Sequence, residues 1–489
     1  MGDMQTQPTC VISHRSLFEM AGRKRRVMLS HKWKMRLLAF LGASFSLLIL
    51  FKVHPLAAAG PAIAVLVLFS YILWGVTGPM FFSIVLFLRP GEMIHPAFEK
   101  LMLGKLTALA CLGFWFIHFI FLNRRHITRD ILAKLMLALT ASIVICSIKS
   151  TVPGHSQQYL NEVWLKLVIL FFAISHLLIK PRALSIYVAT LMGLTVILGL
   201  MGLHKGLTAT PDQLVEGNRV GLGSLFGDPN DYAQMLLACG FSYFLNSILL
   251  APKKWLKVVL IVGMLSVVSG VFMARSRGGF LGFAASSMLI MRSRMSPVVL
   301  MGAGGVMGGL GMVFMMVADR ATASSADGGI DESAQGRLDA WKAAIRMFLK
   351  NPLFGVGYEC YPYNYLSYVT NPVDWKPKAV HSSWLKVIAE LGMSGMFFFF
   401  GMIGVSLKRA YELDQWALKT RISRRGNWFV EAIYRSMFPS LVAWCVCGTF
   451  LSNSFTWFLY VQIAIVIAAT TARDYIDEWL AAHPEPEAA

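Results

Sequence analysis

Long apolar runs constrain this chain more than any other feature of its sequence. A helix that crosses a bilayer needs about 20 predominantly apolar residues, and runs of roughly this kind recur between residues 37 and 471. The chain has 489 residues, of which 56% are hydrophobic and 15% charged. Soluble chains usually carry about 25% charged residues. The sequence therefore predicts an all-α polytopic membrane protein and argues against an aqueous enzyme with one buried core.

The number of apolar runs predicts about 12–14 transmembrane helices. The run at 78–89 is too short to cross a bilayer unless it is extended or broken. The runs interpreted as spans are residues 37–52, 58–76, 78–89, 103–122, 131–148, 163–180, 184–203, 232–251, 255–274, 279–291, 296–317, 393–408, 430–450 and 456–471.

The positive charge of the chain follows the order of these runs. The 45 Lys and Arg residues outnumber the 26 Asp and Glu residues, which gives a net charge of +19. Lysine and arginine concentrate in alternate connections, a pattern that sets membrane orientation. We therefore expect cytoplasmic N- and C-termini and no nucleic-acid partner. The basic connections are 123–130, 180–182, 253–254, 292–294 and 408–429.

The same pattern divides the chain into five parts. We expect the longer connections of the opposite side, above all one large periplasmic loop with short amphipathic helices, to hold the functional residues. The parts are a basic cytoplasmic segment at 1–36, transmembrane helices at 37–317, the large loop at 318–392, C-terminal transmembrane helices at 393–472 and a cytoplasmic tail at 473–489.

Two arginines stand between consecutive apolar runs, on the side where arginine is not expected. Arg275 and Arg277 lie in the segment Ala274–Gly279. A guanidinium at this depth is costly unless it reaches water or an anion, and its shape suits forked hydrogen bonds to phosphate. Snorkelling of both side chains to the interface is the alternative.

A third arginine begins a predicted amphipathic helix in the large loop. In the segment Gly336–Lys350, the residues Leu338, Ile345 and Leu349 belong to one apolar stripe. This pattern predicts a helix on the membrane surface that ends near Pro352. We expect Arg337 to open this helix, where the macrodipole disfavours a cation, and therefore to face either a ligand or the interface.

A histidine precedes a second short helix near the end of the loop. Ser382 or Ser383 is expected to cap this helix, and Gly392 to end it. His381 would then lie at the helix N-terminus, where the dipole favours a neutral ring that can accept a proton. A purely structural role for His381 is the alternative.

A polar segment before the run at 232–251 is a further candidate. Asp228, Asn230 and the upstream Arg219 belong to it. The sequence Asp-Pro-Asn-Asp is a turn that caps the next helix, which accounts for it structurally. Asp228 and Asn230 are also suited to binding sugar hydroxyls, and the sequence leaves both readings open.

Taken in order, these motifs resemble the O-antigen ligase/O-antigen polymerase superfamily of bacterial envelope glycosyltransferases. The resemblance covers about residues 215–400. One departure is Ser382, which stands where the family often has asparagine. The motifs that carry the resemblance are Asp228-Pro229-Asn230, Ser276-Arg277-Gly278-Gly279, Gly336-Arg337 with Trp341, Asn351–Gly357, and His381 followed by Leu385, Glu390 and Leu391-Gly392.

The resemblance implies an enzyme of the bacterial inner membrane that transfers a glycan from undecaprenyl diphosphate to an acceptor hydroxyl on the periplasmic face. Its partners would be this lipid-linked donor, a lipid or glycan acceptor such as lipid A core, and membrane lipids. By motif, Arg277 and Arg337 are the implied phosphate ligands, with Arg275 beside them, and His381 is the implied base. Catalytic roles are thus expected for His381, Arg337 and Arg277.

The chemistry of the implied donor agrees with these residues. A diphosphate is already an activated leaving group, so guanidinium groups suffice to stabilise the charge that develops on it. We therefore expect a metal-independent reaction without a cofactor. Asp331, Glu332 and Asp339 remain alternative acid or base residues in the loop.

Other functions stay open at this point. A polymerase of the same superfamily differs from a ligase only in its acceptor, and we favour a ligase because the loop has an aromatic, basic surface. A transporter or flippase of anionic lipid-linked glycans is the rival class, since Lys105, Lys166, His118 and His176 lie in or near spans. The residues assigned to the loop surface are Trp341, Tyr361, Tyr363, Tyr365, Trp375, Lys376 and Lys378.

Overall fold

The chain is described by a computed structural model, and the described residues are helical. Their only β contacts are two isolated bridges, Val215 with Arg219 and Leu222 with Phe226. The predicted segment 1–36, the runs 37–52 and 58–75, most of 296–317, the first part of the loop and the end of the tail lie outside the described residues. The structure describes residues 76–93, 103–117, 130–215, 218–223, 226–302, 304–305, 309, 332–370 and 376–482.

The helices keep the order of the apolar runs. Two π-helical turns, Leu160–Trp164 and Leu237–Phe241, join α9 to α10 and α12 to α13. The α-helices are α4 Thr77–Leu88, α5 Pro90–Met93, α7 Leu103–Ile117, α8 Ile131–Ile148, α9 Pro153–Tyr159, α10 Leu165–Leu177, α11 Pro181–Thr208, α12 Pro229–Leu236, α13 Ser242–Leu250, α14 Lys254–Met273, α15 Arg277–Met291, α17 Glu332–Lys350, α18 Tyr361–Tyr368, α19 Ser383–Thr420, α20 Trp428–Gly448 and α21 Trp457–Ala482.

The prediction of an all-α polytopic membrane protein is confirmed. Within the described residues, seven helical segments are long and apolar enough to cross a membrane. The prediction of about 12–14 spans is not tested, because several of the runs lie outside the described residues. The seven segments are Ile131–Ile148, Pro153–Leu177, Pro181–Thr208, Pro229–Leu250, Lys254–Met273, Ser383–Thr420 and Trp457–Ala482.

Residues with known helix-starting roles set several of the helix boundaries. The side chain of Asp130 accepts a hydrogen bond from Leu132 N at the start of α8, and Ser276 accepts one from Gly279 N at the start of α15. Pro181 begins α11 at a position where its missing N–H has no helical partner in any case. Short side chains of this kind bind the unpaired N–H groups of a first helical turn.

Several predicted connections are shorter in the structure than in the sequence analysis. The predicted basic connection 408–429 is wrong over its first part, because α19 continues to Thr420. The apolar run 184–203 likewise ends inside α11, which continues to Thr208. Polar residues extend a helix beyond the apolar run once its end leaves the hydrocarbon region, so hydropathy underestimates helix length.

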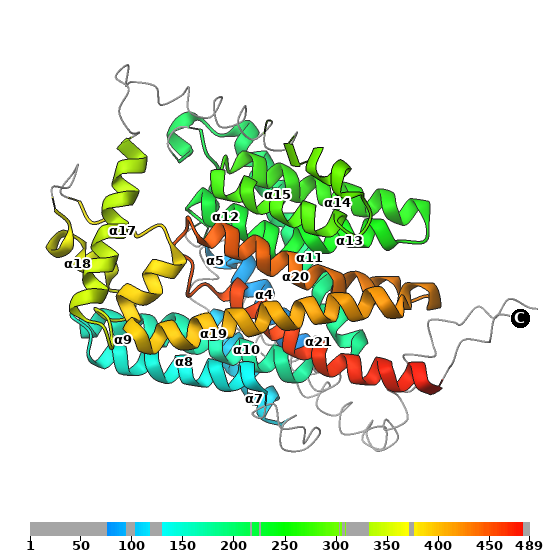
Figure 1. The fold of residues 1–489 in the computed structure, drawn as a ribbon, viewed down its shortest axis with the longest axis horizontal. Helices are drawn as coiled ribbons and strands as arrows, with labels where there is room; N and C mark the ends of the chain where they lie inside the picture. The colour runs from blue at the N-terminus through cyan, green and yellow to red at the C-terminus, as the bar shows by residue number, and fades with distance from the viewer. Residues whose placement is uncertain are drawn as a thin grey trace, which may run out of the picture.

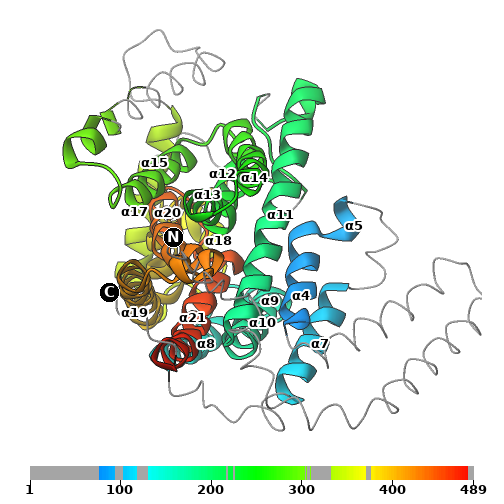
Figure 2. The same ribbon diagram turned by 90° about the vertical axis from the view of Figure 1, so that its right-hand side faces the viewer.

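The helices form a bundle with two different ends. In Figure 1, most long helices run along the same direction, and α17 and α18 lie at one end, which we call the loop end. The connections α13–α14 and α19–α20 lie at the other end, which we call the opposite end. Figure 2 views the bundle from the opposite end and places α4 and α7 at its margin, beside α10.

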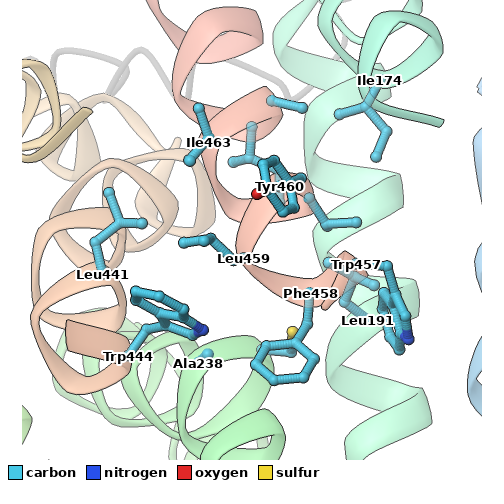
Figure 3. Packing of buried hydrophobic residues seen from close by; sticks show 14 of the residues in the cluster. Ile174, Leu191, Ala238, Leu441, Trp444, Trp457, Phe458, Leu459, Tyr460 and Ile463 are labelled. Carbon is cyan, nitrogen blue, oxygen red and sulfur yellow. The ribbon is translucent and has the colours of Figure 1, made fainter. Parts of the chain in front are cut away.

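Helix α21 is the centre of the bundle. Every residue from Trp457 to Ala469 is buried, as expected for a helix that is apolar on all sides and surrounded by other helices. Figure 3 shows Trp457, Phe458, Leu459, Tyr460 and Ile463 among side chains of α10, α11, α20 and the π-helical turn after α12. This core fixes where α20 ends and α21 begins at the loop end.

A second, smaller core holds the helices of the loop. Helix α17 buries Ala340, Ala343, Ala344 and Met347 against α18 and the first turns of α19. The apolar stripe of Leu338, Ile345 and Leu349 is exposed on α17, which confirms an amphipathic helix. Its contact with a membrane surface remains a prediction.

Candidate active site

His381 is held at the loop end by the connection between α20 and α21. Its backbone N–H donates to Ser452 Oγ at 2.8 Å, and its φ of 50° lies in the left-handed region that non-glycine residues seldom adopt. The neighbouring Ser383 Oγ donates to Leu451 O at 2.6 Å and accepts from Asn453 N at 2.9 Å. An unusual backbone conformation fixed by several contacts is typical of functional sites.

The short helix that follows His381 forms as the sequence predicts. Ser382 caps it and accepts from Leu385 N at 3.4 Å. At Gly392, with φ 61° and ψ −155°, the chain turns into the longer second segment of α19. In Figure 1, the first segment crosses the end of the bundle, and the second runs along the bundle.

The motif Asn351–Gly357 fits against this turn. Met393 N donates to Pro352 O at 2.7 Å, and Gly357 N donates to Glu390 O at 3.0 Å. A Cβ on Gly392 would lie 2.6 Å from Leu353 C, and one on Gly355 would lie 2.3 Å from Glu390 C. Only glycine permits this approach of two backbones, and the contact joins α17 firmly to α19.

A buried charged cluster lies along the same short helix. The carboxylate of Glu390 accepts from Glu359 N and Tyr361 N, both at 3.1 Å. Lys386 Nζ donates to Glu359 Oε1 at 2.7 Å. The sequence analysis quoted Glu390 without a role, although its spacing of four residues from Lys386 indicates a shared helix face. The cluster anchors the start of α18 to the helix that follows His381.

Arg219, Asp228 and Asn230 are joined to the turn between α14 and α15. Asn230 Oδ1 accepts from Arg219 Nη2 at 2.8 Å and from Ser276 Oγ at 2.7 Å. Asn230 Nδ2 donates to Asp228 Oδ1 at 2.8 Å, and Arg219 Nε donates to Ala274 O at 3.3 Å. Asp228 also accepts from Asn230 N as the N-cap of α12, so the predicted capping role is confirmed.

Arg275 and Arg277 lie on either side of Ser276 in this turn. Arg275 is exposed and has a φ of 46°, and Arg277 is half-buried as the first residue of α15. Through Ser276, the predicted arginine motif is thus connected to Asn230. The structure places the turn beside the segment 219–230, as a direct neighbour in the same polar network.

Positive charge from two other parts of the chain acts on His381. Burial lowers the pKa of this histidine, and the Arg337 guanidinium, together with Arg219 and Lys378, lowers it further, whereas Asp228 raises it. Arg337 on α17 and the segment 219–228 before α12 are therefore near enough to His381 for their charges to act on it. A neutral imidazole beside several cations can accept a proton next to a bound anion.

The position of Arg337 differs in detail from the prediction. Arg337 was predicted to be the first residue of its helix, but α17 begins at Glu332. The macrodipole effect falls off within the first turn, so it does not explain this arginine. Gly336, the residue before Arg337, lies next to Lys378. A Cβ added to Gly336 would be 3.2 Å from Lys378 Nζ.

A polar cluster that the sequence analysis did not assign lies close to His381. Asn453 Nδ2 donates to Asp231 Oδ1 at 2.6 Å and to Gln234 Oε1 at 2.8 Å. Asn453 also binds Ser383 Oγ through its backbone N–H. The sequence signal for it is the polar stretch Ser452–Ser454 between two apolar runs.

The proposed aromatic surface of the loop is wrong for two of its members. Tyr361 and Tyr365 are each 1% exposed, and Tyr361 Oη donates to Ala340 O at 2.7 Å. Their spacing of four residues places both on the buried face of α18, whereas Tyr363 is exposed. Trp375 lies outside the described residues.

These observations define a class of protein: a polytopic helical membrane protein with arginines and a neutral histidine gathered at one end of its bundle. Residues 260–400 match the family model described as O-Antigen ligase. The match includes Arg275, Arg277, Arg337 and His381, and it confirms the resemblance predicted from the sequence. These residues are thus similar to the O-antigen ligase/polymerase-type superfamily of glycosyltransferases. No curated protein matches the chain closely enough to count as a relative.

Proposed function

We propose that this protein transfers a glycan from undecaprenyl diphosphate to an acceptor hydroxyl on the extracytoplasmic face of the bacterial inner membrane. The convergence of Arg337, Arg219 and Lys378 on His381 is the observation that carries this proposal. It gathers cations and a proton acceptor from distant parts of the chain at one end of a membrane bundle. The loop end would then face away from the cytoplasm.

The cations would act on the leaving group. The acceptor oxygen forms a bond to the anomeric carbon of the donor while the bond from this carbon to the diphosphate oxygen breaks. The lipid diphosphate leaves with the electron pair, and its new negative charge needs positive partners. Arg337 and Arg277 are proposed as catalytic phosphate ligands, with Arg275 and Arg219 in supporting positions. Guanidinium groups suit this role because they form paired hydrogen bonds to phosphate oxygens.

His381 would act on the acceptor. Because burial and Arg337 lower its pKa, the ring is neutral at neutral pH and accepts the proton of the attacking hydroxyl. A positioned general base contributes about 10²–10⁴-fold to such a reaction. Asp228 and Asn230 lie on the same side and are proposed to bind sugar hydroxyls. Because the donor is already activated, no step of this scheme requires a metal ion or a nucleotide.

A ligase is proposed as the first choice, with lipid A core or another lipid as the acceptor. Lys376 and Tyr363 are exposed, so they retain part of the aromatic, basic loop surface that favoured a ligase. A polymerase uses the same chemistry with a lipid-linked glycan as acceptor. The lipids of a deletion strain distinguish the two: full-length polymer accumulates on undecaprenyl diphosphate without a ligase, whereas polymer length is lost without a polymerase.

The central test is the replacement His381→Ala, assayed with purified lipid-linked donor and acceptor. We expect transfer to fall by about 10²–10⁴-fold, with normal membrane insertion. Ser382→Ala is a matched control, since it changes the neighbouring cap and costs about 1 kcal/mol of helix stability. Full transfer by the His381→Ala protein would overturn the assignment of the base. Vectorial movement of the donor without any transfer would support the rival transporter class.

A further inference from the structure

Three ring side chains on α9 and α18 form a partly exposed cluster at the loop end. The rings of His155 and Tyr159 on α9 have centroids 4.7 Å apart, and the ring of His155 lies 4.6 Å from that of Tyr363 on α18. Tyr363 Oη and His155 Nδ1 are 3.2 Å apart and share a hydrogen bond. We call His155, Tyr159 and Tyr363 the aromatic patch.

The patch is exposed although its helices are firmly held. Tyr363 is 58% and Tyr159 is 39% exposed. Asn364 Nδ2, next to Tyr363, donates to Thr151 Oγ1 and to Cys360 O, both at 2.8 Å, and so joins α18 to the start of α9. The rings are thus arranged before any ligand binds, which reduces the conformational entropy that binding would cost.

The patch is connected to the proposed reaction centre through the first segment of α19. Glu390 on this segment accepts from Tyr361 N at the start of α18, and His381 precedes the same segment. The helix from Ser383 to Glu390 rises roughly 10 Å at about 1.5 Å per residue. The patch and His381 are therefore connected to opposite ends of the same short helix.

We propose that the aromatic patch is a subsite for sugar units of the glycan that do not react. This inference rests on the proposed function and adds a place for the remainder of the chain that is transferred. A pyranose ring presents C–H groups that pack against an aromatic face, and its hydroxyls bind phenol oxygens and amides. The patch offers two tyrosine rings, and the exposed Gln158 lies three residues from His155 on the same helix face.

The composition of the patch favours a sugar over the other ligands of a membrane enzyme. Its side chains are rings and hydroxyls, with the amide of Gln158 beside them, which match hydroxyl-rich surfaces, whereas phosphate groups select arginine and lysine. Tyrosine is also common where a helix leaves the bilayer, so anchoring at the lipid interface is the competing role. Helix α9 itself, with the sequence Pro-Gly-His-Ser-Gln-Gln-Tyr, lacks the aliphatic residues that such an anchor buries.

The test measures binding of free glycan, which involves no lipid diphosphate and no reaction. The probe is the saccharide released by mild acid from the lipid-linked donor that a deletion strain accumulates. Binding to the purified full-length protein is followed by saturation-transfer NMR and by titration. We expect Tyr363→Ala and Tyr159→Ala to weaken binding by roughly tenfold, and Tyr363→Phe to retain most of it. The matched control is Tyr411→Ala, an exposed tyrosine on α19 near the opposite end.

The outcomes separate this inference from the proposed function. His381→Ala should lose transfer and still bind free glycan, and full transfer by that variant would overturn the function while leaving the patch intact. Unchanged glycan binding by both tyrosine variants, with unchanged melting temperatures, would overturn the patch. If these variants change only in how they partition into lipid nanodiscs, the patch is a membrane anchor. That result would also overturn the sugar-binding role of the patch.

Discussion

The two ends of the bundle use arginine in different ways. At the opposite end, arginines form ion pairs with carboxylates of neighbouring helices. Arg292 Nη2 lies 3.0 Å from Asp414 Oδ2, and Arg409 Nη1 lies 2.5 Å from Asp130 Oδ2. Each pair joins elements far apart in the sequence, so these arginines hold helices together.

At the loop end, several cations act on a single histidine. Arg219 donates to the amide oxygen of Asn230 and to the carbonyl of Ala274, and it acts with Arg337 and Lys378 on His381. Gathering like charges raises their mutual repulsion, which an anionic ligand relieves. The comparison shows that the same residue type joins helices at one end and shifts the pKa of a histidine at the other.

The largest expected effect separates the two kinds of arginine directly. Arg337→Ala should reduce transfer by about 10²–10³-fold, because one hydrogen-bond donor to the developing charge is lost. Arg409→Ala should leave the rate per folded molecule unchanged, since its partner Asp130 lies at the opposite end. Transfer rates of both purified variants, normalised to folded protein, provide the measurement. Equal losses in the two variants would remove the distinction between the ends.

The next effect concerns stability. The side chains of Asp414 and Arg435 are 9% and 7% exposed, and Asp414 also binds Arg292. Asp414→Ala leaves two cations without this partner, and we expect a loss of about 3 kcal/mol in the free energy of unfolding. Glu412→Ala is the matched control, because its pair with Lys408 is 55% and 78% exposed and exposed pairs contribute about 0–1 kcal/mol.

Thermal unfolding in detergent or nanodiscs measures both variants. A small change for Asp414→Ala, similar to that of Glu412→Ala, would show that the opposite end is not held by its buried charges. Its arginines would then need another explanation, such as anionic lipid headgroups at the membrane surface.

The sequence predicts the bundle well because hydropathy is a local property. The run 131–148 coincides with α8, and Asp130 and Ser276 act as the caps that their residue types indicate. Gly392 likewise marks the end of the short helix after His381. Each of these features is decided by neighbouring residues, so one sequence is enough to find it.

The arrangement of the site is a tertiary property, and only part of it could be predicted. The motifs drew attention to Arg337 and His381, but their convergence depends on the close contact between the turn at Gly392 and the segment before Gly355. Lys378 was assigned only to the loop surface, and Asn453 was missed because it stands in a short polar stretch with no motif of its own. The surface assigned to Tyr361 and Tyr365 was wrong because α18 buries that face.

The smallest expected effect tests the electrostatic link between Arg337 and His381. If His381 is the base, transfer falls as the pH drops through the pKa of this histidine. Arg337 lowers that pKa, so Arg337→Gln should raise it and move the acid limb of the pH–rate profile to higher pH. Arg337→Lys keeps the charge and should leave the limb close to its original position, although both variants transfer more slowly.

Asp228 provides the opposite change at the same histidine. Its carboxylate raises the pKa of His381, so Asp228→Asn should move the acid limb to lower pH. Asparagine is as good an N-cap as aspartate, so the start of α12 is retained. A general loss of structure would not move the limb in opposite directions in two variants. Profiles that coincide after normalisation would show that His381 does not titrate in the rate-limiting step, and the loop end would then bind the donor without supplying the base.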